Sequence, residues 1–95
     1  MNVATTDIIK RSGERASESF IQEKLHSSIL SACLSVKSPE GEAETIAKIV
    51  SDLVDTWRQG RHAVTSHDLR RVAAQHLTHL HPEAAYLYQH HQLVL

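Results

Sequence analysis

Residues 62–85 read HAVTSHDLRRVAAQHLTHLHPEAA, and this stretch decides the fold. Its first residues, His62-Ala63-Val64, favour a short extended strand. Thr65, with Asp68 three residues later, is a capping signature that predicts a helix directly after the strand. The positions expected to face inward on this helix are Leu69, Val72, Ala73, His76, Leu77 and Leu80. Pro82 ends that helix and begins another, because proline is favoured at the first helical position.

Two more helices are predicted upstream. Apolar residues with helical spacing in the first are Ile21, Leu25, Ile29, Ala32, Cys33 and Val36. Those in the second are Ala43, Ile46, Ile49, Val50, Leu53, Val54 and Trp57. Ser19 with Gln22 is a candidate capping box for the first helix. That helix is expected to stop within residues 38–41, since Pro39 cannot continue it, and the second is expected to stop at Gly60.

The N-terminal part predicts a β-hairpin. Residues 8–11 are β-compatible, Ser12-Gly13-Glu14 is expected to turn because Gly13 tolerates positive φ, and residues 15–20 return as the second strand. The predicted order is β-β-α-α-β-α-α. This is a mostly helical α+β fold, a four-helix bundle capped by a small three-stranded sheet. We expect one domain over residues 1–95 with its core at about 8–88.

Composition narrows the function classes. The 95 residues carry a formal net charge of −1, which gives no general attraction to nucleic acid or to an anionic membrane. The chain holds one cysteine, Cys33, expected to be a buried core thiol, so neither an intramolecular disulfide nor a CxxC zinc site is expected. The N-terminus lacks the pattern of a signal peptide, and no apolar run approaches the length of a membrane helix. We therefore expect a cytoplasmic protein without membrane or direct nucleic-acid partners.

Four short motifs carry a family resemblance. They are Lys10-Arg11-Ser12-Gly13, Phe20 with Lys24-Leu25, Val64-Thr65-Ser66, and Pro82-Glu83-Ala84-Ala85-Tyr86. In this order and spacing the chain resembles, from about Ile8 to Tyr88, the ATP-cone of many ribonucleotide reductases and of the repressor of their genes. The resemblance implies a helical bundle with a three-stranded sheet as its cap. It also implies binding of ATP or dATP, with or without Mg²⁺, that sets activity or oligomeric state.

The resemblance implies a set of nucleotide-binding residues: Ile9, Lys10, Arg11, Glu18, Lys24 and Thr65. Glu18 matches the family's pocket carboxylate if the hairpin here holds two extra residues. Cations at a strand end and at a helix start suit a triphosphate, and a helix N-terminus adds free N–H groups. Two departures stand out. Ser12 replaces the usual acidic residue before Gly13, and the segment from Tyr88 to Leu95 lacks the family's terminal basic residue.

Three functions remain open. No nucleophile–base set, P-loop or carboxylate pair is present, so we expect no enzyme. The first hypothesis is a nucleotide sensor that acts through self-association or through a separate ribonucleotide reductase subunit or regulator. The second is a degenerate cone that serves protein–protein interaction or oligomerisation without nucleotide. The third and weakest is a histidine-based metal protein, using His76, His79, His81, His90 and His91.

The aromatic residues also allow two interpretations. Tyr86 and Tyr88 are candidates to flank an adenine ring, but core packing with the hydroxyl at the surface is the preferred prediction for both. Trp57 is expected to pack in the core.

Overall fold

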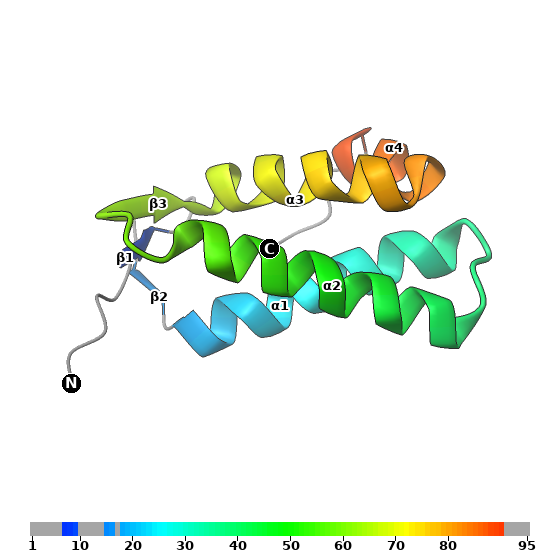
Figure 1. Cartoon of the computed structure of the whole chain (residues 1–95), viewed down its shortest axis with the longest axis horizontal. Coiled ribbons are helices and arrows are strands. Elements are labelled where there is room, and N and C mark those ends of the chain that lie inside the picture. The colour runs from blue at the N-terminus through cyan, green and yellow to red at the C-terminus, as the bar shows by residue number, and fades with distance from the viewer. Residues whose placement is uncertain (1–6, 10–14, 17, 91–95) are drawn as a thin grey trace.

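The computed structural model describes residues 7–9, 15–16 and 18–90. Its elements in chain order are β1 (Asp7–Ile9), β2 (Arg15–Ala16), α1 (Glu18–Ser35), α2 (Glu40–Arg58), β3 (Ala63–Thr65), α3 (Ser66–Leu80) and α4 (Pro82–His90) (Figure 1). The mostly helical class and the four predicted helices are confirmed.

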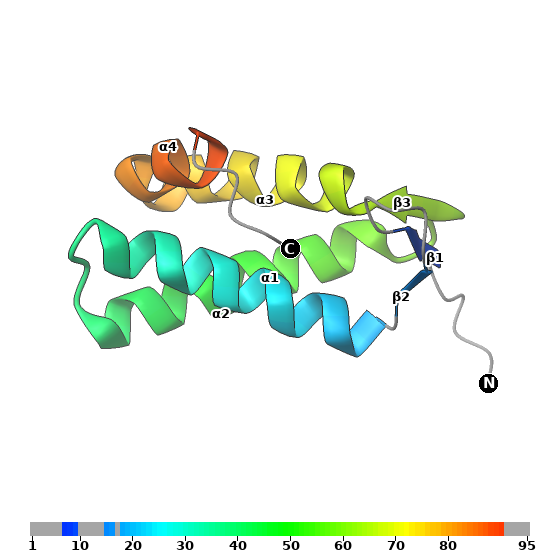
Figure 2. The ribbon, with the colours of Figure 1, turned by 180° about the vertical axis from the view of Figure 1, so that it is seen from behind.

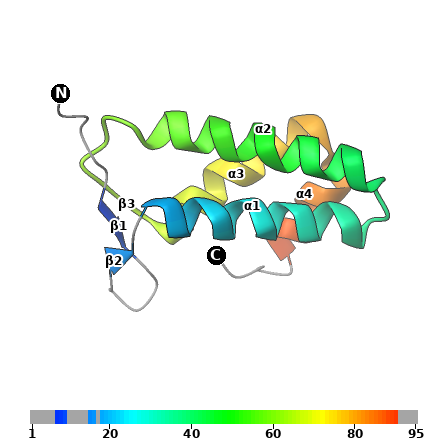
Figure 3. The same cartoon turned by 90° about the horizontal axis from the view of Figure 1, so that it is seen from below.

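The strands meet at one end of the helices, next to the start of α1 and of α3 (Figure 3). The order across the sheet is β2-β1-β3. β1 pairs antiparallel with β2 and parallel with β3, in a register that sets Ile8 opposite Val64 and Ile9 opposite Thr65. β1 therefore ends beside the residue from which α3 begins.

The helices are packed so that each one contacts two others. α1 lies against α2 and α4, and α3 lies against α2 and α4. α4 folds back beside α3, as the view from behind in Figure 2 shows. The core between them contains mainly aliphatic side chains, of which the largest fully buried ones are Ile21, Leu25, Ile29, Leu69, Leu77, Val50, Val54 and Cys33. The prediction of a buried Cys33 is thus confirmed, and burial raises the pKa of its thiol.

Some predicted core positions are exposed instead. Leu80 is 44% exposed, because it is the last residue of α3, where the chain turns at His81 into α4. Ile49 and Leu53 are 41% and 40% exposed, since the main packing partners of α2 among the described elements are α1 and α3. The apolar stripe of α2 is therefore wider than the surface that its neighbours cover.

The boundaries of α1 differ from the prediction at both ends. The predicted pairing of two antiparallel hairpin strands is confirmed, but β2 has only two residues. The predicted extension of this strand over residues 18–20 is wrong, because α1 begins at Glu18. Ser19 lies inside the first turn and is not the N-cap of a capping box.

A left-handed residue ends α1 before Pro39 is reached. Lys37 has φ of 64°, its N–H donates to the carbonyl of Leu34 at 3.0 Å, and the N–H of Ser38 donates to the carbonyl of Cys33 at 3.1 Å. These two bonds form a Schellman motif. At the end of α2, Gly60 takes φ of 82° just after the helix, as the sequence predicted.

Lys37→Gly is expected to raise the free energy of unfolding by about 0.5–1 kcal/mol, because glycine adopts the left-handed region without the Cβ penalty that Lys37 carries. Urea denaturation measures the change. Ser35→Gly is the matched control, since Ser35 is the last residue of α1 and glycine within a helix is destabilising. A loss of stability in Lys37→Gly would contradict the assigned role of this residue.

Candidate functional site

The end of β1 and the start of α3 meet at Ile9 and Thr65. Thr65 is the N-cap of α3 and forms the predicted capping box. The Asp68 N–H donates to Thr65 Oγ1 at 3.0 Å, and the Thr65 N–H donates to Asp68 Oδ2 at 3.1 Å. The hydrogen bond from this backbone N–H lowers the pKa of Asp68, so its carboxylate is ionised at neutral pH. The junction is thereby fixed by both backbone and side-chain bonds.

Thr65→Ala is expected to lower the free energy of unfolding by about 1 kcal/mol, because Asp68 loses the acceptor for its N–H. Chemical denaturation of both proteins checks this value. Thr65→Ser keeps a hydroxyl at the cap and is expected to retain most of the stability. An equal loss in the serine variant would show that the hydroxyl is not what matters.

The other predicted site residues are placed as follows. Ile9 is the last residue of β1, and Lys24 is half-buried on α1. Glu18 is the first residue of α1 and not part of the second hairpin strand, where the prediction for residues 15–20 had placed it. Lys10 and Arg11 lie outside the described residues. The structure thus brings Ile9 and Thr65 together at the end of the sheet.

A cavity of about 600 Å³ lies between α3 and α4, and its described lining begins at His67, two residues after Thr65. Its described lining comprises His67, Arg70, Arg71, Ala74 and Gln75 from α3, with Tyr88 and Gln89 from α4. The volume falls within the range of small-molecule sites. The described lining contains two guanidinium groups and one imidazole but no carboxylate, which suits an anionic ligand.

Tyr88 forms the inner wall of this cavity. It is buried, and its hydroxyl is hydrogen-bonded to the hydroxyl of Ser28 on α1 at 3.3 Å. Burial raises the pKa of Tyr88, while the hydrogen bond with Ser28 and the positive charge of Arg70 act in the opposite direction. The hydroxyl of Tyr88 is therefore inside the protein and not at the surface, contrary to the prediction.

The other two aromatic predictions have different outcomes. Tyr86 is 65% exposed and its ring lies 4.1 Å from that of His90, so the prediction that it packs in the core is wrong. Trp57 is half-buried and packs against the core, and the guanidinium of Arg61 lies 4.1 Å from the centre of its ring.

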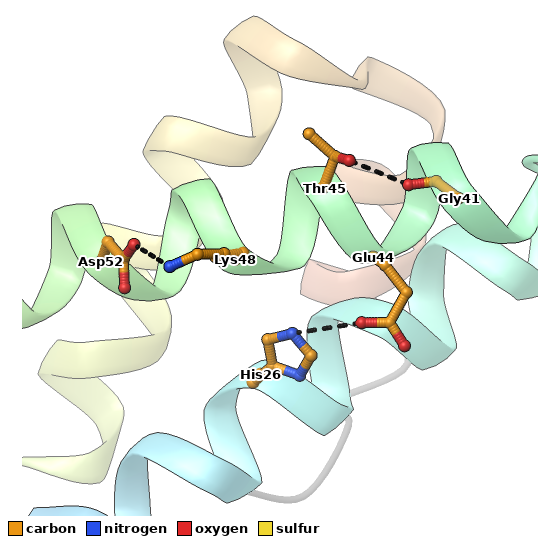
Figure 4. Close-up of polar contacts among 6 residues, drawn as sticks. All are labelled: His26, Gly41, Glu44, Thr45, Lys48 and Asp52. Carbon is orange, nitrogen blue, oxygen red and sulfur yellow. Dashed lines mark hydrogen bonds and ion pairs between the residues drawn. The ribbon is translucent and has the colours of Figure 1, made fainter.

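A second hollow, of about 570 Å³, lies between α1 and α2 but differs in charge. Glu23 and Asp52 are part of its lining. Figure 4 shows that the basic groups here face carboxylates: Lys48 Nζ is 2.9 Å from Asp52 Oδ2, and His26 Nε2 is 3.5 Å from Glu44 Oε2. This hollow is therefore less suited to a polyanion than the cavity between α3 and α4.

Sequence reasoning missed the arginines of α3 as site residues. The signal was present, because Arg58, Arg61, Arg70 and Arg71 make residues 58–71 basic. Within α3, moreover, His67, Arg70, Arg71 and Ala74 follow the three- and four-residue spacing of one helix face. What the spacing does not give is the position of α4, which turns this face into the wall of a cavity.

The third hypothesis was a metal site formed by histidines. Throughout the described residues, no group of three or more His, Cys, Asp or Glu side chains is placed to hold a metal ion. The same part of the chain contains no helix with the length and apolar character needed to cross a membrane.

Comparison with known proteins gives one finding. The profile of the ATP cone domain family matches residues 6–91, which is nearly the whole chain. No curated protein and no solved structure gives a match. The match spans both strands of the hairpin, the capped start of α3 and the cavity between α3 and α4. On this ground the chain belongs to the ATP-cone family.

Proposed function

We propose that this protein binds ATP or dATP at the start of α3, between the end of β1 and the cavity that α3 shares with α4, and that it has a regulatory and not a catalytic role. The observation that carries the proposal is the parallel register of β1 and β3, which sets Ile9 opposite the N-cap Thr65. Lys10 and Arg11 are the next residues of the chain after Ile9. The start of α3 offers N–H groups and a partial positive charge, and the cavity lined by arginines begins at His67 in its first turn.

The regulatory step needs a difference in affinity between two states. A ligand shifts a conformational or assembly equilibrium only when it binds one state more tightly than the other. The proposed site includes the start of α3 and the cavity between α3 and α4, so an occupied site can change how these two helices are held together. We propose self-association, or docking on a separate ribonucleotide reductase subunit or regulator, as the readout.

A second candidate function is an interaction module that no longer binds nucleotide. Ile49 and Leu53 favour it, because they lie one turn apart on the exposed side of α2 and offer apolar surface to a partner. Gln89, near the end of α4, also contributes no charge to the cavity. The two candidates differ in whether nucleotide binds at all.

Calorimetric titration of the whole chain with ATP and dATP, each with and without Mg²⁺, tests the proposal. The expected result is saturable binding, accompanied by a change of mass in size-exclusion chromatography with light scattering. Nucleotide at 100 times its Kd should also stabilise the fold by about 2.7 kcal/mol in a thermal melt. GTP is the control for base recognition. A flat titration at millimolar ATP and dATP would overturn nucleotide sensing and favour the interaction module.

A further inference from the structure

We propose that Arg70 and Arg71 of α3 bind the phosphate groups of the nucleotide, in the cavity between α3 and α4. The inference rests on the proposed function and adds to it the residues that hold the phosphates. Neither arginine belongs to the motifs that carry the family resemblance.

The chemistry of the cavity favours phosphate. Arginine is always charged at physiological pH, and its planar guanidinium presents five donors in a geometry that matches phosphate oxygens in pairs. Both arginines line the same cavity of about 600 Å³, with His67 beside them and no carboxylate in the described lining. A polyanion is therefore the ligand class that this cavity suits.

The carboxylate of Asp68 holds Arg71 only weakly. Arg71 Nη2 lies 3.8 Å from Asp68 Oδ1, and both side chains are substantially exposed, so this ion pair is weak. The other oxygen of Asp68 accepts from the backbone N–H of Thr65, which keeps that carboxylate at the helix cap. Arg71 can thus exchange a weak surface pair for a phosphate contact.

Arg70 is less exposed than Arg71 and lines the same cavity. It is half-buried, and its charge reaches the buried phenol of Tyr88, which is itself bonded to Ser28 of α1. Arg70 and Tyr88 also line the same cavity, so Arg70 lies at the boundary between α3 and α4. A half-buried arginine loses less conformational freedom when a ligand binds than an arginine in solvent does.

The two arginines are also close to the junction at which we place the nucleotide. Arg70 is the fifth residue after Thr65, which corresponds to a rise of about 7.5 Å along the axis of α3. A nucleotide bound near the end of β1 can therefore direct its phosphate chain along α3, past the helix N-terminus and toward both guanidinium groups.

The test is calorimetric titration of the full chain with ATP, AMP, adenosine and inorganic tripolyphosphate. The variants are Arg70→Gln, Arg71→Gln and the double substitution. Lys48→Gln is the matched control, because this substitution also removes one positive charge. Lys48 is exposed on α2, where it pairs with Asp52. We expect each single arginine variant to weaken ATP binding about tenfold or more. We expect adenosine binding to change little and Lys48→Gln to behave as wild type.

Arg70→Lys separates a local contact from net charge, and it also keeps the apolar stem should Arg70→Gln fail to fold. It retains the charge but not the paired donors, so an intermediate affinity for ATP is expected. Wild type that binds ATP while the double variant matches Lys48→Gln would overturn the inference and leave the proposed function standing. Wild type that binds tripolyphosphate as tightly as ATP, and no adenosine, would overturn the proposed function but support the anion site. Binding of neither would overturn both.

Discussion

Leu77→Ala is expected to lower the free energy of unfolding by about 3–4 kcal/mol. Leu77 is completely buried on α3, within the single cluster of core side chains that the described helices share. Truncation removes the transfer free energy of its side chain and leaves a cavity that the surrounding helices only partly fill. A domain of 95 residues has little stability to spare, so the midpoint of thermal unfolding should fall by roughly 15–25 °C.

Leu80→Ala is the control on the same helix. Leu80 differs from Leu77 in being 44% exposed, so its truncation should cost less than 1 kcal/mol. Urea denaturation measures the free energy of unfolding of both variants, and equal m-values make the two values comparable. Equal losses for the two leucines would contradict the packing described for α3 and α4. The contrast also probes a position of α3 at which the sequence pattern predicted burial wrongly.

Helix locations were predictable because their signals are local. The capping box of α3 depends on Thr65 and Asp68, which are three residues apart, and Pro82 begins α4 where the sequence placed it. The periodic apolar residues of α1 and α2 likewise marked most of the buried positions. The start of α1 was missed because residues 18–20 carry no strong helix or strand signal of their own. Its end was missed because Lys37 is a non-glycine residue with a left-handed backbone.

The candidate site was only partly predictable, for a different reason. Thr65 could be assigned because a helix cap is formed by its own neighbours. The role of Arg70 depends on α4 returning along α3, and the burial of the Tyr88 hydroxyl depends on Ser28, 60 residues away in the chain. Such contacts are set by tertiary packing, which the periodicity of one helix does not report. The sequence thus indicated the cationic content of residues 58–71 but not the cavity that two of these arginines line.

The double substitution Lys10→Ala with Arg11→Ala is expected to weaken ATP affinity by about 100-fold, or roughly 3 kcal/mol at two charge-assisted contacts. The reason is position in the chain. Both residues directly follow Ile9, and Ile9 pairs with the N-cap of α3, where the N–H groups of the helix favour an anion. Calorimetric titration with ATP measures the loss, and a thermal melt without ligand shows whether the variant remains folded.

Lys37→Ala with Lys48→Ala is the matched control, because it removes two positive charges from exposed residues on other parts of the chain. It should change ATP affinity by less than threefold, since charges separated from a ligand by more than about 8 Å are largely screened at physiological salt. If both double variants lost affinity equally, net charge and not a local site would govern binding. If neither lost affinity while wild type still bound ATP, the nucleotide would lie elsewhere than at the end of β1. A loss confined to the Lys10 and Arg11 variant would instead tie the strand, the capped helix and the ligand to one place.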